Sequence, residues 1–270
     1  DISFGVISAI ILAAMSSVFL IMFIAPFLTS YPFNNAFTLK HVTAVFESSD
    51  LLSVYKNSIF VALFTAVFGT ILTYSAALLN ARTAINGKKS IDMISMITNT
   101  VPGMVLGLSY LLLFNGSSLK GTFLILIICN IVHYFTTPYL MVKNAFSKMN
   151  PSWETTGELL GDSWFKTVYR VILPNSKSTV IEMFSYYFVN SMVTISGIIF
   201  LISAQTSLVA SKIKELQHFA KFNEIFVLSL LIFFTNLFVK LTCDYLQKRA
   251  LVKKTQKYTA KVRDIYVQKV

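Results

Sequence analysis

A polar segment of the chain reads Trp153-Glu154-Thr155-Thr156-Gly157-Glu158-Leu159-Leu160-Gly161-Asp162-Ser163 and runs on to Val171-Ile172-Leu173-Pro174. Asn150 and Pro151 suit the start of a helix, and Gly161 suits the left-handed residue that ends one. Asp162 or Ser163 then caps a second helix, which Pro174 bounds. The segment therefore predicts two short helices with a sharp bend at Gly161.

On both sides of this segment the chain is strongly apolar. Hydrophobic residues make up 55% of the 270 residues, charged residues only 13%, and the mean hydropathy is +0.66. A soluble domain of this size needs more charge on its surface, whereas an apolar helix of about 20 residues crosses a bilayer. The composition predicts an all-α, polytopic membrane protein that forms one domain over residues 1–270.

Six apolar blocks are long enough to be transmembrane helices, and turn-forming or charged residues separate them. The predicted spans are roughly 4–28, 57–80, 91–114, 121–142, 178–203 and 224–246. Two connecting stretches, residues 37–46 and 208–222, are amphipathic and predict short surface helices. These helices either lie on the membrane surface or help to receive a soluble partner.

Lysine and arginine residues cluster on one side of these spans. They follow the second span (Arg82, Lys88, Lys89), follow the fourth (Lys143, Lys148, Lys166, Arg170, Lys177), and form a basic tail at about residues 247–270. The opposite side carries Lys40, Lys56, Lys120, Lys212, Lys214 and Lys221. By the positive-inside rule, both termini and the polar segment are expected in the cytoplasm. The net charge of +11 is then explained without a nucleic-acid partner.

The polar segment resembles the EAA loop of binding-protein-dependent ABC transporter permeases, whose pattern is Glu-Ala-Ala, three residues, Gly, nine residues and Ile-x-Leu-Pro. Aligned on Gly161, the Leu173-Pro174 pair matches without a gap, whereas Thr155-Thr156-Gly157 replace Glu-Ala-Ala. Glu154, one residue earlier, is the candidate to take the role of the glutamate of the Glu-Ala-Ala pattern. The resemblance implies an ATPase-coupling loop at about residues 148–176, with Glu154, Thr155, Thr156, Gly157, Leu160, Gly161, Asp162, Ser163, Leu173 and Pro174 as its site residues.

The resemblance covers most of the chain. Residues 101–110 and 194–201 are similar to the third and fifth spans of permeases for ferric iron and for 2-aminoethylphosphonate, and Tyr31-Pro32-Phe33-Asn34 is similar to their outer loop. This implies the MetI-like fold of a bacterial inner-membrane permease that imports a small polar or anionic solute, either a phosphonate or ferric iron. The implied partners are a pair of cytoplasmic ABC ATPase subunits, a second permease half, an extracytoplasmic binding protein and membrane lipid. Because such permeases often occur as fused halves, the missing initial Met fits one half of a longer protein.

Polar residues inside the third and fifth spans are candidates for the translocation pathway, since polar groups in hydrocarbon usually face a bundle interior or a water-filled path. Asn190, Thr194 and Gly197 fall at helical spacing and predict one shared face. Interhelical hydrogen bonding is the competing explanation for each residue alone. The candidate pathway residues are Asn99, Pro102, Gly103, Asn190, Ser191, Thr194 and Ser196.

Two titratable residues also lie within predicted spans. Glu182 is expected to form a structural or inner-gate ion pair with Lys177 or Arg170. His133 is either a proton relay or metal ligand, or a structural residue bonded to a neighbouring helix.

Two other functional classes compete with the importer. A secondary transporter driven by an ion gradient needs buried coupling residues and commonly inverted repeats, but only Glu182 and His133 qualify loosely and no repeat is visible. An intramembrane enzyme needs a nucleophile-base pair or a metal site, and the sequence offers neither, nor any cofactor site. A Gly-rich phosphate loop ending in Lys-Ser/Thr is also absent, so ATP hydrolysis is expected in a separate subunit.

Overall fold

The computed structural model describes residues 2–30 and 33–267. Tyr31 and Pro32 of the predicted outer loop, and residues 268–270 of the basic tail, lie outside the described residues. Among the described residues the regular secondary structure is helical apart from one short antiparallel hairpin, formed by β1 (Leu28–Ser30) and β2 (Asn34–Phe37). The prediction of a helical protein is therefore confirmed, with this hairpin as an addition.

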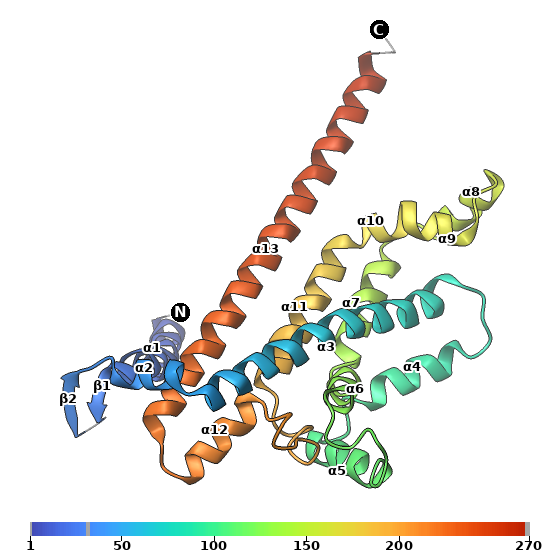
Figure 1. The fold of residues 1–270 in the computed structure, drawn as a ribbon. Coiled ribbons are helices and arrows are strands. Elements are labelled where there is room, and N and C mark those ends of the chain that lie inside the picture. Colours follow the sequence, from blue (N-terminus) through green and yellow to red (C-terminus); the bar gives the residue numbers. More distant parts are fainter. Residues whose placement is uncertain (1, 31–32, 268–270) are drawn as a thin grey trace.

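The helices follow the chain in the order shown in Figure 1. They are α1 (Ile2–Ile24), η1 (Ala25–Phe27), α2 (Lys40–Glu47), α3 (Ser49–Arg82), α4 (Lys88–Ile97), α5 (Gly103–Leu113), α6 (Phe123–His133), α7 (Thr136–Ser147), α8 (Trp153–Leu159), α9 (Trp164–Thr167), the π-helical turn η2 (Val168–Ile172), α10 (Leu173–Asn175), α11 (Lys177–Val193), α12 (Val209–His218) and α13 (Phe222–Val267).

The long helix α3 is the centre of the bundle and packs against α6, α7 and α11. Its buried face carries small residues such as Ala62, Ala66 and Gly69, which let neighbouring helices approach closely. A Cβ atom on Gly69 would lie only 2.9 Å from the ring of Tyr187 in α11. The side chain of Ser48 accepts a hydrogen bond from the Leu51 amide and so caps the start of α3.

The expected count of six continuous spans is not confirmed. Among the described helices, α1, α3 and the first part of α13 (residues 222–250) are long and apolar enough to cross a membrane, and the bent pair α6–α7 makes a possible fourth. The predicted spans 91–114, 121–142 and 178–203 each contain a break in the helix.

Prolines account for two of these breaks. Pro102 lacks an amide N–H and disfavours a helical residue before it, so α4 ends at Ile97 and α5 starts at Gly103. Pro138 lies in the first turn of α7, where an amide N–H has no partner within the helix and its loss costs nothing. In a straight helix, however, the ring of Pro138 would clash with the carbonyl of Tyr134 four residues earlier, so the chain bends here. The axes of α6 and α7 accordingly differ by 52°.

The third break ends α11 at Val193. Thr194 is extended, with φ −72° and ψ 138°, and residues 194–208 form turns without a regular helix. The prediction that Asn190, Thr194 and Gly197 share one helical face is therefore wrong, because only Asn190 belongs to a helix.

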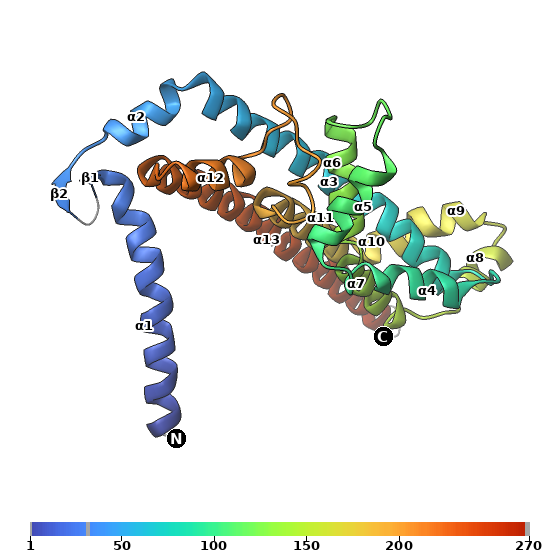
Figure 2. The ribbon, with the colours of Figure 1, turned by 90° about the horizontal axis from the view of Figure 1, so that it is seen from below.

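Most of the first helix points away from the bundle in Figure 2, and its last turns contact α13 through Phe19 and Phe23. No residue in its most apolar window is buried. The two predicted amphipathic surface helices are confirmed as α2 and α12. Both lie at the end of the molecule opposite to α8 and α9 (Figure 1).

Candidate functional site

The residues 148–176 form a bent pair of short helices. Gly161 has φ +76°, its amide donates to the Glu158 carbonyl at 2.9 Å, and the Asp162 amide donates to the Gly157 carbonyl at 2.9 Å. These two bonds are the Schellman arrangement that ends a helix, and it needs a left-handed residue at its centre. Ser163 then caps α9 by accepting from the Lys166 amide. The predicted bend at Gly161 is confirmed, and of the two expected caps Ser163 is the one used.

The ends of this helix pair differ from the prediction. The first helix starts at Trp153 and not at Pro151, and its N-cap is Ser152 and not Asn150. The Asn150 side chain instead accepts from the Ser152 amide and forms a turn before the helix. Pro174 does not end the second helix, because the chain continues from α9 through η2 and α10 almost directly into α11. The helix pair is thus a direct extension of a helix that crosses the bundle.

Gly157 fits the closest contact between the two short helices. A Cβ atom at this position would lie 2.4 Å from Oγ1 of Thr167, a residue that is buried at the end of α9. Any larger residue must push α8 away from α9, so the glycine in the alanine position of the family pattern lets the two helices pack tightly.

Glu154 faces the bundle. The guanidinium of Arg82, at the end of α3, donates to its two carboxylate oxygens at 2.5 and 2.8 Å and also to the Asn150 carbonyl at 2.9 Å. Both side chains are mostly buried. A carboxylate held in this way anchors α8 to α3, so the interpretation of Glu154 as the polar contact for a partner is not supported by its geometry. Arg82 was not predicted as a partner of Glu154, because in the sequence it stands out only as a charge of the loop after the second span.

Large apolar side chains cover the outer surface of the helix pair. Leu159, Leu160, Phe165 and Tyr169 are 73–83% exposed. Thr155 and Thr156 are also exposed, and Asp162 pairs with Lys166 along α9. An apolar cluster on a polar, anchored projection is typical of a protein-protein contact, and only Leu160 of the four had been selected from the sequence.

The candidate pathway residues divide into two groups. Gly103 and Ser196 meet where the helix breaks come together, and His133, which was considered separately, lies beside them: a Cβ atom on Gly103 would lie 2.4 Å from Oγ of Ser196 and 3.0 Å from Cε1 of His133. Thr194 is buried and pairs with the Tyr134 hydroxyl at 2.5 Å.

The remaining pathway residues are more scattered. Asn99 and Pro102 are exposed, Ser191 is buried, and Asn190 is half-buried and donates to the Tyr186 carbonyl of its own helix. A cavity of about 120 Å³ lies beside the first group, and it is lined by Asn99 of the predicted pathway residues and by His133. The role of these residues in transport stays a prediction.

Glu182 lies on the exposed side of α11. Within the described residues it forms no ion pair with Lys177, Arg170 or any other cation. The predicted ion pair of Glu182 is therefore wrong within this chain. Its side chain lies on the face of α11 that points away from α3.

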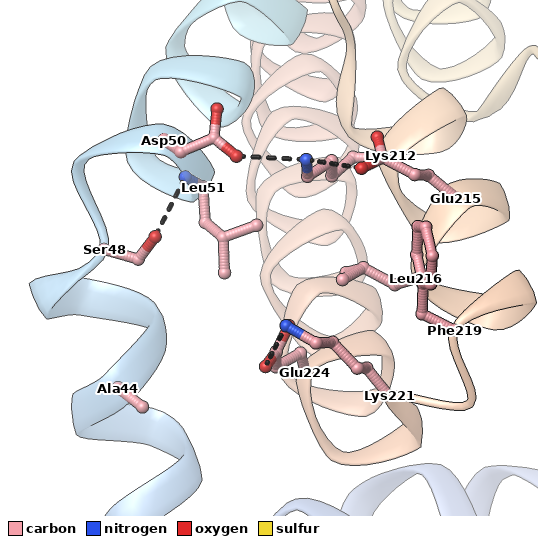
Figure 3. Close-up of a pocket in the computed structure, with 10 residues that line it drawn as sticks. All are labelled: Ala44, Ser48, Asp50, Leu51, Lys212, Glu215, Leu216, Phe219, Lys221 and Glu224. Carbon is pink, nitrogen blue, oxygen red and sulfur yellow. Dashed lines mark hydrogen bonds and ion pairs between the residues drawn. The ribbon is translucent and has the colours of Figure 1, made fainter.

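A charged groove of about 400 Å³ opens between the α2–α3 corner and α12 (Figure 3). Lys212 bridges Asp50 of α3 and Glu215 of its own helix at 3.0 Å each. Burial by itself would lower the pKa of Lys212, but its hydrogen bonds to Glu215 and Asp50 outweigh burial and raise that pKa above its ordinary value. The lining residues are Ala44, Ser48, Asp50, Leu51, Lys212, Glu215, Leu216, Phe219, Lys221 and Glu224.

A bent helix pair projecting from a bundle of broken apolar helices fits a membrane subunit of a transport system, and the comparison with known families gives this class directly. Residues 86–252 match the family described as binding-protein-dependent transport system inner membrane component, and the chain belongs to this family.

Curated relatives agree with this assignment. The chain is 30% identical over 195 residues to the putative ferric transport system permease protein FbpB 1 of Haemophilus influenzae, a match that covers 68% of this chain and 30% of the relative. It is 29% identical over 144 residues to the ferric transport system permease protein FbpB of Actinobacillus pleuropneumoniae, covering 53% of this chain and 20% of that protein. The chain therefore matches less than a third of the length of either relative.

Solved structures show the same fold. A bacterial ABC transporter that imports the acidic polysaccharide alginate aligns with a TM-score of 0.74 at 14% identity, over 91% of this chain and 96% of that one. The methionine transporter MetNI aligns with a TM-score of 0.60 at 12% identity, over 75% and 99%. The MetI-like permease fold expected from the sequence is thereby supported.

Proposed function

We propose that the chain forms one half of the membrane pore of an ATP-driven ABC importer. The observation that carries this proposal is the anchored helix pair of residues 153–167, which projects from the bundle with an apolar outer surface. Because α9 to α11 are nearly continuous, a push on α8 and α9 reaches the bundle without passing through a loose loop.

A cytoplasmic ATPase dimer is the partner that this surface would take. Leu159, Leu160 and Phe165 supply the apolar centre of such a contact, and Thr155 and Thr156 supply its polar edge. The positive-inside distribution of Lys and Arg supports a cytoplasmic position for residues 148–176 and for both termini. The chain itself then hydrolyses no ATP.

The charged groove between α3 and α12 would receive the extracytoplasmic binding protein, because it lies at the opposite end of the bundle. Phe219 at its edge is 63% exposed, and Asp50 and Lys221 are also largely exposed. A second permease half, fused or separate, would complete the pore, and the short share of the relatives that the chain matches is consistent with a fused arrangement.

The names of the curated relatives support ferric iron as the cargo of the importer. The comparisons give no support to the phosphonate that the sequence resemblance had also suggested. Family membership favours the ATP-driven importer over the ion-gradient-driven transporter.

The test is to purify the native complex in mild detergent and reconstitute it in liposomes. We expect an ABC ATPase and a binding protein to copurify, and ATP hydrolysis to drive solute uptake. In Gly161→Pro, which removes both the left-handed glycine and its N–H bond to Glu158, we expect ATP hydrolysis to continue while uptake is lost. Uptake that ignores ATP but follows a proton or sodium gradient would overturn the proposal.

A further inference from the structure

A small polar cavity lies where two of the helix breaks meet the middle of α11. It has a volume of about 120 Å³, well above the roughly 10–15 Å³ that a single water needs. Its walls come from the α4–α5 break, the α6–α7 bend and the middle of α11. The lining residues are Thr98, Asn99, Val101, His133, Tyr134, Thr136, Thr137 and Tyr186.

Part of this lining is fixed by bonds within the protein. The Thr136 hydroxyl donates to the Ser95 carbonyl at 2.6 Å and lies 2.8 Å from the Thr98 hydroxyl, while Tyr134 pairs with Thr194 at 2.5 Å. These bonds join α4, α7 and the end of α11 into one wall. The shape of the cavity is therefore set before anything enters it.

Four other lining side chains have no such bond. Asn99, His133, Thr137 and Tyr186 make no side-chain hydrogen bond to another described residue, and Nδ1 of His133 is shielded from solvent and has no partner. Buried polar groups in proteins are nearly always paired, and in hydrocarbon an unpaired one costs several kcal/mol. This cost applies to the buried Nδ1 of His133. The side chains of Asn99, Thr137 and Tyr186 are partly or largely exposed, and they retain free hydrogen-bonding capacity for a guest.

The chemistry of the lining favours an anion. All four free groups can donate a hydrogen bond, and no Asp, Glu, Lys or Arg lines the cavity. Thr136 and Thr137 occupy the first turn of the twelve-residue helix α7, whose amides have no acceptor within the helix and whose dipole adds positive potential. A bare trivalent cation needs anionic ligands that this lining lacks.

We propose that this cavity binds an oxyanion group of the transported solute, with His133, Tyr186, Asn99 and Thr137 as its hydrogen-bond donors. The proposal rests on the chain being an importer permease. It implies that a ferric cargo passes as a complex with its own anionic ligands, since the carboxylates of such a complex and a phosphorus oxyanion share the chemistry that the cavity recognises.

The test uses the complete transporter complex in lipid nanodiscs without its binding protein. Saturable binding of radiolabelled inorganic phosphate and of ferric citrate is measured separately. Retention of phosphate identifies a phosphorus oxyanion site, and retention of ferric citrate alone identifies a carboxylate complex. In Tyr186→Phe and in Thr137→Val we expect the affinity to fall about tenfold, because each variant removes one donor to a charged guest while keeping the shape.

Matched controls are Tyr245→Phe, on an exposed part of α13, and Thr100→Val, whose hydroxyl already bonds the Ile97 carbonyl. Both should bind as the wild type does. No saturable binding of either anion, or equal binding in all variants, overturns the proposal. ATP hydrolysis is then measured on the same preparations before and after the binding protein is added, so a failure of the importer assignment is recognised separately.

Discussion

Arg82 and Glu154 are 72 residues apart in the sequence and form a two-pronged ion pair, with N–O distances of 2.5 and 2.8 Å. Arg82 ends the central helix α3, and Glu154 lies in the first turn of α8. The pair therefore ties the projecting helix pair to the helix around which the bundle packs.

Loss of this ion pair should loosen the helix pair and leave the bundle intact. Removing one partner of a buried pair costs roughly 3–5 kcal/mol, so in Glu154→Gln we expect faster amide hydrogen exchange over residues 153–167 and a several-fold fall in uptake per ATP hydrolysed. Glu158→Gln is the control, because Glu158 is exposed and forms no ion pair among the described residues. A charge-swapped Arg82→Glu/Glu154→Arg protein that recovers no exchange protection would argue against the anchor.

Substitutions of Gly161 should follow the cost of a left-handed backbone. A residue with a Cβ atom pays about 1–2 kcal/mol there, and Asn pays least. Since nothing lies within 4 Å of the position, uptake should decrease in the order Gly, Asn, Ala, Val without any steric clash. The control is Gly116→Ala: Gly116 has φ +83° and open space around it, so this variant introduces the same backbone strain outside the helix pair. If Gly116→Ala lowered uptake as much as Gly161→Ala does, general destabilisation of the protein would be the cause.

The contact between Gly157 and Thr167 predicts a compensating pair. Gly157→Ala brings a Cβ atom to 2.4 Å from Oγ1 of Thr167, so we expect lower uptake and a thermal unfolding temperature reduced by a few degrees. Adding Thr167→Ala removes the hydroxyl and the methyl group and should restore both values. A double variant that behaves worse than Gly157→Ala would contradict this packing explanation.

The exposed apolar cluster predicts a binding defect without a folding defect. Leu159→Ser and Phe165→Ser change side chains that are largely exposed, so the unfolding temperature should stay constant. Loss of a central apolar contact typically costs 2 kcal/mol or more, and the ATPase should copurify at least about tenfold less. Leu39 is exposed and directly precedes α2, at the end of the bundle opposite to α8 and α9; in Leu39→Ser the ATPase should copurify normally. Unchanged copurification in both cluster variants would place the ATPase contact elsewhere.

The Lys212 bridge predicts an alkaline effect. A raised pKa means that its stabilisation is complete below the ordinary value of 10.5 and disappears as the pH rises above it. Lys212→Met should therefore lower the free energy of unfolding by about 1 kcal/mol, which corresponds to an unfolding temperature roughly 2–4 °C lower. This decrease should be constant between pH 7 and 10. The difference should shrink at higher pH. Lys214→Met, on the exposed side of α12, should show neither effect.

Local chemistry predicted the local features of the fold. The bend at Gly161, the cap at Ser163 and the surface helices α2 and α12 follow from a few neighbouring residues, and all are present. Hydropathy placed the apolar blocks but could not show the breaks at Thr98–Pro102 and Thr194, because irregular backbone inside a membrane depends on what it lines.

Contacts between residues far apart in the sequence could not be predicted either. The direction in which Glu154 points is decided by Arg82, and the direction of Glu182 by the packing of α11 on α3, and neither is written in nearby residues. The unpaired Nδ1 of His133 could not be predicted from the sequence, since whether a nitrogen has a partner depends on its three-dimensional surroundings.

Gly107 of α5 and Gly197 of the segment after α11 meet backbone to backbone: a Cβ atom on Gly107 would lie 2.2 Å from the Gly197 carbonyl oxygen. That carbonyl also accepts from the Cys129 thiol of α6 at 3.3 Å. Because no side chain lies between them, α5 and the segment after α11 are in direct backbone contact and cannot shift relative to each other by a change of side-chain rotamer. During a transport cycle they should travel as one block, and the articulation points should fall in the polypeptide on either side of it, at residues 98–102 and 134–135.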